Sequence, residues 1–177
     1  MLKKVNKLIF DTSIIKEIDW ENYRSLSSSY HSMNAMKELH SPYGGLPDSF
    51  NEWNTIIFQK FFNDNELDFK TLSEQTQMDI KTVSIIKQRP GNIIPLHIDT
   101  FYKLRKTFPN DTRMPVRANY FLEDWKLGHF IQFNDEVFTH WEELTGFIFN
   151  QDIPHLSANC GMQDKFTLQL SGFLDDY

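Results

Sequence analysis

Short apolar runs separated by turn residues fill the chain from about residue 82 onward. Each run is rich in Val, Ile, Leu or Phe and is bounded by Gly, Pro, Asn or Asp, which is typical of β-strands. Asn134 and Asp135 predict a tight turn between two of these strands. Many short strands of this kind predict a sandwich or barrel of the jelly-roll type. The predicted strands span residues 83–87, 93–101, 115–122, 130–133, 136–141, 147–150, 153–157 and 166–172.

The first part of the chain has a helical pattern instead. Ser49 and Glu52 fit a capping box, and apolar residues then recur at helical spacing at Phe50, Trp53, Ile56, Ile57 and Phe61. We therefore expect a single domain over residues 1–177. In it, residues 1–80 form a helical buttress on the outer face of one sheet, and residues 81–177 form the jelly-roll core. The predicted class is mainly β with N-terminal helices.

Composition limits the classes of function. The chain has 177 residues with 40% hydrophobic and 15% aromatic residues, which is enough for one compact domain with its own core. The formal net charge is −6 and there is no long basic run. Binding to nucleic acid depends mainly on Lys and Arg that meet phosphate, so we expect no nucleic-acid partner.

Cysteine content and the N-terminal residues point to a cytoplasmic protein. Cys160 is the single cysteine of the sequence, which excludes a disulfide framework and a Cys-rich zinc site. The apolar patch at residues 8–10 is too short for a signal peptide or a membrane span, so no membrane partner is expected. The chain ends soon after the last predicted strand and leaves no room for dimerisation helices there, so we expect a monomer.

A candidate metal site is encoded by His97, Asp99 and His155. Residues two apart in an extended strand point to the same face, so His97 and Asp99 would lie side by side, with Ile98 turned away. His155 would supply a third ligand from a later strand. Two histidines and one carboxylate on one side of an ion, with the opposite positions open, are the ligands of non-haem Fe(II) oxygenases. A His-x-Asp tripeptide by itself also occurs by chance, with the histidine exposed or hydrogen-bonded.

Four segments between Gly91 and Gly172 make the pattern more specific: "PGNIIPLHID", "VRANYFLEDWKLGHFI", "PHLSAN" and "KFTLQLSGF". This part of the chain resembles the Fe(II)- and 2-oxoglutarate-dependent oxygenases. The resemblance implies a double-stranded β-helix (a cupin-like jelly roll) with Fe(II) held by His97, Asp99 and His155. It also implies 2-oxoglutarate and O₂ as cosubstrates, with ascorbate as a possible reductant. The implied reaction forms succinate and hydroxylates an unactivated C–H bond.

The family also needs a cation for the far carboxylate of 2-oxoglutarate, and the resemblance assigns that role to Lys165, ten positions after His155. A dianion that enters a pocket needs a positive partner and hydrogen-bond donors to offset its desolvation. Thr167 would share the face of Lys165, whereas Arg117 is a second candidate cation with Asn119 on the same face. A lysine at this position resembles the prolyl-hydroxylase-like branch of the family. A peptidyl residue such as proline is therefore the favoured substrate, with a free amino acid or another small metabolite left open.

Two rival interpretations stay open at this point. Residues 72–76 and 81–86 look somewhat like a helix-turn-helix that binds DNA, although Gln77 stands near the place of the usual turn glycine. A cupin-like metal protein that does not use 2-oxoglutarate is the other rival. Turnover of 2-oxoglutarate to succinate would separate these interpretations. Lys165 has a simpler interpretation as a solvated lysine at a strand edge, and His31 and His40 are expected to be exposed.

Overall fold

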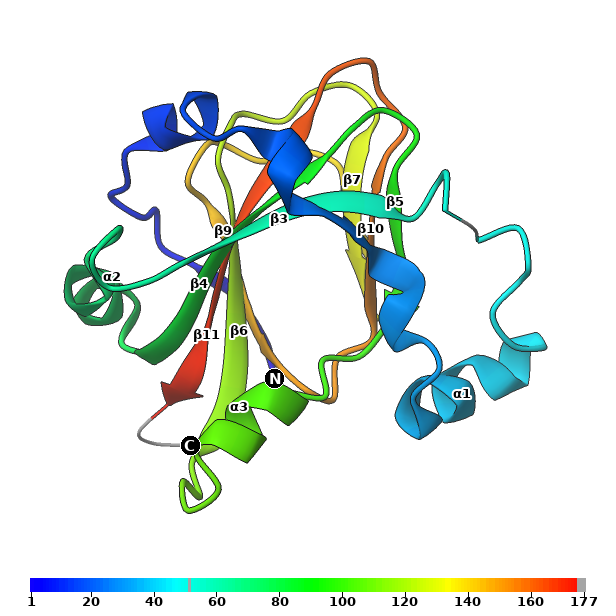
Figure 1. The fold of residues 1–177 in the computed structure, drawn as a ribbon, viewed down its shortest axis with the longest axis horizontal. Coiled ribbons are helices and arrows are strands. Elements are labelled where there is room, and N and C mark those ends of the chain that lie inside the picture. The colour runs from blue at the N-terminus through cyan, green and yellow to red at the C-terminus, as the bar shows by residue number, and fades with distance from the viewer. Residues whose placement is uncertain (51, 175–177) are drawn as a thin grey trace.

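Two antiparallel sheets face each other in the computed structural model, which describes residues 1–50 and 52–174 (Figure 1). The larger sheet has the strand order β1 (Leu2–Val5), β9 (Gly146–Asn150), β6 (Met114–Phe121), β11 (Lys165–Leu174), β4 (Asp79–Gln88), β3 (Ile56–Phe62) and β2 (Arg24–Leu26). The smaller sheet has the order β5 (Ile93–His97), β10 (His155–Asn159), β7 (His129–Phe133) and β8 (Glu136–Phe138). The predicted jelly roll is confirmed.

Short helices surround the sheets. They are α1 (Asn34–His40), α2 (Phe69–Thr76), α3 (Tyr102–Thr107) and the 3-10 helices η1 (Thr12–Lys16), η2 (Trp20–Tyr23), η3 (Ser27–Tyr30) and η4 (Ser41–Tyr43). As expected, helical segments cover the outer face of the larger sheet: Ile15, Trp20 and Leu72 are buried in one cluster with Val83 and Leu168. Within the described residues, none of the helices combines the length and the apolar content that crossing a membrane would require.

The expectation of a helical buttress over residues 1–80 is only partly right, because strands as well as helices form there. Three strands, β1, β2 and β3, lie within it, and the predicted helix after Ser49 is replaced by turns and then by β3. Position 51, inside that predicted helix, lies outside the described residues. Pairing of β3 with β4, for example Phe58 with Lys87 and Phe62 with Val83, overrides the local pattern. Short apolar runs do not separate a helix from a buried strand, because both can carry the same residues.

The helix-turn-helix interpretation is wrong. Its first segment does form α2, capped by the Asp68 carboxylate, which accepts from the Thr71 backbone N–H at 3.0 Å. The second segment, residues 81–86, is instead the middle of β4, which pairs with both β3 and β11. Its run of β-branched residues favours a strand, and no recognition helix exists at this position.

Replacement of Gln77 by glycine is expected to stabilise the fold. Gln77 ends α2 in the left-handed conformation, with φ of 56°. A residue with a Cβ is disfavoured there by about 1–2 kcal/mol, part of which the greater flexibility of unfolded glycine cancels. We expect Gln77→Gly to raise the free energy of unfolding by about 0.5–1 kcal/mol in urea denaturation. A lower midpoint than that of the wild type would contradict this.

Alternation along the strands gives the larger sheet two different faces. On β11, Leu168 and Leu170 point outward into the cluster under the helices, whereas Lys165, Thr167 and Ser171 belong to the alternate set that faces the smaller sheet. A second apolar cluster, Phe121, Ile131, Phe133, Phe147, Phe149 and Ile153, joins the two sheets on this inner side. Polar side chains and phenylalanines therefore share the interior, and the candidate site residues lie among them.

Candidate metal centre

His97 and His155 lie next to each other because β5 and β10 are neighbouring strands. The two residues are directly paired in the antiparallel register, and their ring centroids are 4.1 Å apart. His155 is 4% exposed and packs against Phe133 and Phe149, with ring centroids at 5.7 and 4.6 Å. The sequence prediction that these distant histidines converge agrees with this geometry.

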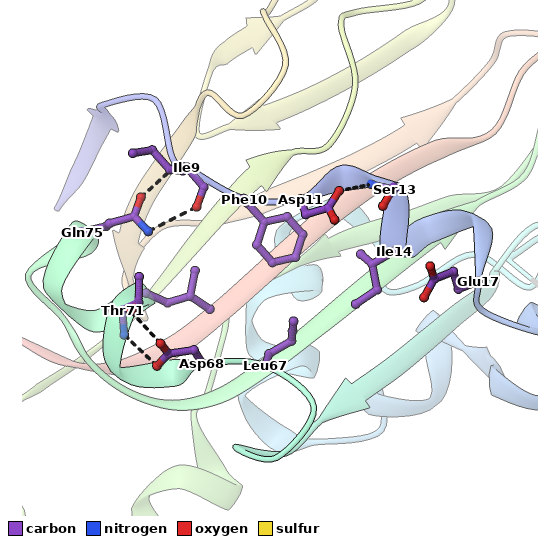
Figure 2. Close-up of a pocket in the computed structure, with 11 residues that line it drawn as sticks. Ile9, Phe10, Asp11, Ser13, Ile14, Glu17, Leu67, Asp68, Thr71 and Gln75 are labelled. Carbon is purple, nitrogen blue, oxygen red and sulfur yellow. Dashed lines mark hydrogen bonds between the residues drawn. The ribbon is translucent and has the colours of Figure 1, made fainter.

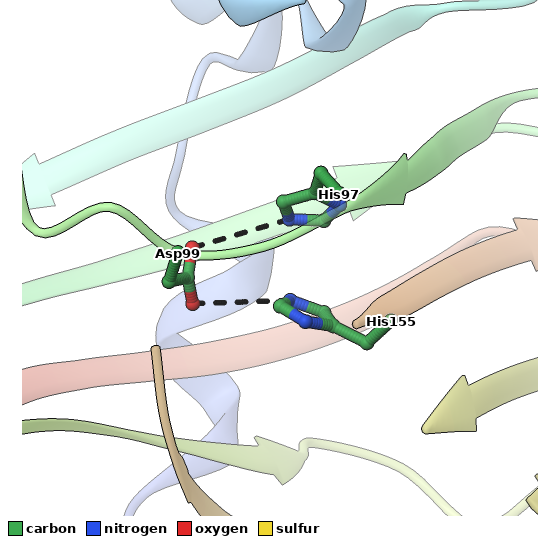
Figure 3. A group of neighbouring side chains, drawn as sticks. All are labelled: His97, Asp99 and His155. Atoms are coloured by element: carbon green, nitrogen blue, oxygen red, sulfur yellow. Dashed lines mark ion pairs between the residues drawn. The ribbon is translucent and has the colours of Figure 1, made fainter. Parts of the chain in front are cut away.

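Asp99 lies beside the two histidines, but it is not on a strand as predicted. The strand expected over residues 93–101 ends at His97, so Asp99 lies beyond the sheet and strand alternation does not orient it. Its Oδ1 is 4.0 Å from Nε2 of His97, and its Oδ2 is 3.8 Å from Nε2 of His155 (Figure 3). One possible ligand atom from each of the three residues lies within 4.8 Å of the other two.

Backbone carbonyls set the orientation of both imidazoles. Nδ1 of His97 is 2.9 Å from the oxygen of Pro95, and Nδ1 of His155 is 2.9 Å from the oxygen of Ile153. A carbonyl only accepts, so each Nδ1 carries the proton and donates it. Each Nε2 then keeps its lone pair, and both Nε2 atoms face Asp99. Metal-binding histidines usually donate their second ring N–H in this way.

The protonation states also suit a cation. Burial lowers the pKa of His97 to about 3, and burial likewise lowers the pKa of His155. Burial alone would raise the pKa of Asp99, but the charge of Arg117 and the two histidines outweigh it, so that pKa lies below its ordinary value. At neutral pH the site therefore holds two neutral imidazoles and one carboxylate, which is the form that binds a metal.

Oδ2 of Asp99 provides a test of whether these residues fit a metal ion. Asp99 is 7% exposed, and its Oδ2 is buried without a hydrogen-bond partner. An unpaired buried carboxylate oxygen is costly in a folded protein. A divalent ion between the carboxylate and the two Nε2 atoms would remove that cost. The donor set of two imidazoles and one carboxylate fits Fe(II), and it is the one such group among the residues that the structure describes.

Lys165 lies in the interior and not at a solvated edge. It is 2% exposed, and its ammonium donates to the Phe130 carbonyl at 2.9 Å and to the Ser157 hydroxyl. Burial lowers its pKa to about 7. Ser157 follows His155 by two residues on β10, a step of about 7 Å along the strand. A buried cation at this distance from the histidines is well placed for an anionic group.

Three further residues lie around Lys165, and the sequence placed none of them beside it. The Ser157 hydroxyl donates to Oε1 of Gln88 at 2.7 Å, and the ammonium of Lys165 lies 5.6 Å from the ring centroid of Trp141. Ser157 could have been found, because it alternates with His155 on one strand. Gln88 and Trp141 carry no such signal, because only the register between strands brings them here.

The inner face of the larger sheet carries Arg117, Asn119 and Thr167, but these residues are spread along β6 and β11 and do not gather around one point. Arg117 pairs with Ser171 on β11, six residues from Lys165, which is about 20 Å along the strand. The guanidinium contacts Asp99 instead. Asn119 is buried and its Oδ1 has no partner, and Thr167 is 7% exposed.

His31 and His40 are buried and not exposed, contrary to expectation. Their rings stack with centroids 4.9 Å apart, and they are 7% and 5% exposed. Nε2 of His40 lies 2.7 Å from the oxygen of Leu96, so it donates to the residue before His97. The N-terminal segment thus supports the strand that carries the first histidine.

A hollow of about 330 Å³ lies on the other side of the larger sheet, between η1 and α2 (Figure 2). It is lined by apolar side chains such as Phe10 and Ile14 and by the carboxylates of Asp11 and Asp68. Each carboxylate caps its own helix by accepting a backbone N–H at 3.0 Å. None of the predicted site residues lines this hollow.

Comparison with known proteins identifies the fold. No family model and no curated protein matches this sequence. Among solved structures, the viral collagen prolyl hydroxylase of Paramecium Bursaria Chlorella virus-1, in complex with 2-oxoglutarate, matches with a TM-score of 0.51 and 13% identity, over 65% of this chain and 77% of that one. The chain has the double-stranded β-helix fold of the Fe(II)/2-oxoglutarate oxygenases. The α-ketoglutarate-dependent carbocyclase SnoK of nogalamycin biosynthesis matches with a TM-score of 0.52 and 9% identity, over 85% of this chain and 75% of that one.

At identities this low the likeness concerns the fold. It confirms the architecture expected from the four segments between Gly91 and Gly172, and it extends beyond them, since the match to SnoK covers 85% of the chain. The double-stranded β-helix places neighbouring strands so that residues far apart in sequence meet between two sheets, as His97 and His155 do here.

Proposed function

We propose that the protein is an Fe(II)- and 2-oxoglutarate-dependent dioxygenase that hydroxylates an unactivated C–H bond. One observation carries the proposal: two neutral imidazoles and a carboxylate with an unpartnered buried oxygen converge inside an oxygenase fold. The proposed reaction converts substrate, 2-oxoglutarate and O₂ into hydroxylated substrate, succinate and CO₂, which balances all atoms. Bound iron would supply the redox chemistry that couples the decarboxylation to C–H oxidation.

The chain's own residues would bind and orient the reactants. His97, Asp99 and His155 would hold the ion from one side. The Lys165 ammonium would bind the far carboxylate of 2-oxoglutarate, with Thr167 as a neighbouring hydrogen-bond donor. Desolvation of this dianion is offset only if Lys165 is charged when the ligand enters, so the ligand would raise the lysine's pKa above its low unliganded value. The phenylalanine cluster beside His155 would exclude water from the reacting atoms.

A peptidyl residue such as proline is the substrate that we favour. Support comes from Lys165, ten residues after His155 as in prolyl-hydroxylase-like members, and from the likeness to a viral collagen prolyl hydroxylase. The likeness to SnoK, an enzyme of nogalamycin biosynthesis, supports the alternative, a small-molecule substrate. We further propose a cytoplasmic setting, in which a reducing environment keeps iron ferrous.

Slow formation of succinate without any substrate is the expected sign of this activity. Purified protein with Fe(II), ascorbate and 2-oxoglutarate should release succinate above background, because the cosubstrate is consumed slowly when no C–H bond is offered. His155→Ala should reduce the rate to background by removing a ligand. His140→Ala is the matched control, since that histidine is exposed and stacks on Trp125, with ring centroids 4.2 Å apart, away from the three ligands.

The same assay separates the rival function. A cupin-like metal protein would bind Fe(II) but release no more succinate than His155→Ala, and that result would overturn the proposal. If succinate forms, adding peptide pools and metabolite pools in separate reactions shows which of them raises the rate, and mass spectrometry then locates the added oxygen.

A further inference from the structure

The two oxygens of Asp99 have different surroundings. Oδ1 accepts a hydrogen bond from Nη1 of Arg117, which also forms an ion pair with it. Oδ2 is buried without a partner and lies nearest to Nε2 of His155, at 3.8 Å. Oδ1 lies 4.0 Å from Nε2 of His97, so both oxygens border the site, but only Oδ2 has no hydrogen-bond partner in the protein.

Arg117 is fixed by contacts on several sides. It lies in the middle of β6 and pairs with Phe149 on β9 and Ser171 on β11. Its Nε donates to the Ser171 hydroxyl at 3.2 Å, and its guanidinium carbon lies 5.5 Å from the ring centroid of Phe101. The side chain is 20% exposed, so solvent screens the ion pair only partly.

The backbone after Asp99 is shaped to allow this contact. Phe101 has φ of 50° and ψ of 27°, the left-handed region, and is 6% exposed. This conformation costs a bulky residue on the order of 1–2 kcal/mol. It turns the chain from the end of β5 into α3 and places the phenyl ring beside the guanidinium of Arg117. Strain of this kind is concentrated at functional sites.

We propose that Arg117 is a positioning residue that occupies Oδ1 of Asp99, so that Oδ2 is the single carboxylate oxygen offered to the metal. This inference rests on the proposed function, and it gives Arg117 a different role from the cosubstrate anchor considered from the sequence. A carboxylate that binds through both oxygens fills one more position around an ion. Holding back Oδ1 keeps that position open for the reactants of a two-histidine, one-carboxylate site.

Arginine suits this role better than lysine. The guanidinium presents several N–H donors in a rigid plane and stays charged in proteins. It can therefore bind Ser171 through Nε and Asp99 through Nη1 at the same time. Lys165 donates to Phe130 and Ser157 and not to Asp99, so the two cations serve different groups.

Counting the water molecules on bound Mn(II) tests the inference directly. Mn(II) is added to the protein without cosubstrate, and water-proton relaxation measures the inner-sphere waters. In Arg117→Met both Oδ1 and Oδ2 can bind the ion, so one water is lost from roughly three open positions. The relaxivity per bound Mn(II) should therefore fall by about one third. Arg105→Met is the matched control, because that exposed arginine contacts Gln151 and not the ligands.

Circular dichroism first checks that each variant is folded. If Arg117→Met does not fold, Arg117→Leu is measured in its place with the same expected fall, because leucine has no N–H to donate to Oδ1. Unchanged relaxivity with a tenfold higher KM for 2-oxoglutarate would overturn the inference and make Arg117 the cosubstrate anchor. The Mn(II) result needs no turnover, so absence of succinate in the wild type would refute the proposed function without deciding the role of Arg117.

Discussion

Asp99→Ala is expected to abolish tight binding of iron while both sheets stay folded. The change removes one of three converging ligands and the only one that carries a charge. Loss of residues that merely support ligands costs about 10–100-fold in metal affinity, so loss of this ligand should cost on the order of 100-fold or more. Calorimetric titration of the apoprotein with Fe(II) under anaerobic conditions measures the change.

Two companion variants make that result specific. Asp99→Ala leaves the Arg117 guanidinium without its partner, so Asp99→Asn is measured beside it, because the amide oxygen can still accept from Arg117. Both should lose iron, whereas Asp111→Ala should keep it, since Asp111 pairs with Arg113 outside the site. Affinity like that of the wild type in Asp99→Asn would show that the cation is held elsewhere.

Lys165→Met is expected to raise the KM for 2-oxoglutarate by about 100-fold, because truncating one member of a buried charge pair costs about 2–5 kcal/mol. Metal affinity should change much less, since Lys165 contacts Phe130, Ser157 and Trp141 and none of the three ligands. Steady-state succinate formation gives the KM, and Fe(II) titration gives the affinity. Lys87→Met is the matched control, because Lys87 pairs with Asp164 at 2.7 Å and packs near Trp20 on the opposite face.

The pH dependence gives a second measure of the same lysine. Burial lowers its pKa to about 7, so above pH 7 the unliganded site loses its charge and affinity for the dianion should fall by about tenfold per pH unit. The stability of the unliganded protein should rise over the pH range in which its affinity for the dianion falls. Between pH 7 and the ordinary value of 10.5 the unfolded chain holds the proton that the folded chain has lost, so the free energy of unfolding rises with pH there. Lys165→Met should remove both slopes, and a pH-independent KM in the wild type would contradict the assignment.

The strands of the core were largely predictable because each of them is a short apolar run bounded by turn residues. The predicted run at 115–122 matches β6 to within one residue at each end, for example, and the run at 166–172 lies within β11. Prediction failed where the same residues suit a helix and a strand. The segment containing Ile56, Ile57 and Phe61 has helical spacing, yet hydrogen bonding to β4 makes it β3.

The candidate site has members that were proposed from the sequence and a geometry that was not. The spacing of His97, Asp99, His155 and Lys165 resembles the pattern of the oxygenase family, and that resemblance needs no coordinates. The orientation of Asp99 does need them, because β5 ends at His97 and the chain turns through the strained Phe101. Partners of the ligands, such as Pro95 and Ile153 for the two Nδ1 atoms, depend on side-chain rotation that no spacing encodes.

By itself the sequence determined the fold class, because this follows from residue type and from period-two patterning along each strand, whereas the ligand set and the buried cation were what the family resemblance implied. The tertiary structure alone decided which oxygen of Asp99 is free, that Arg117 contacts Asp99 while Lys165 lies elsewhere, and that His40 supports β5. The physical reason is that register and twist between strands fix these distances, and strand pairing is a long-range property that local sequence does not contain.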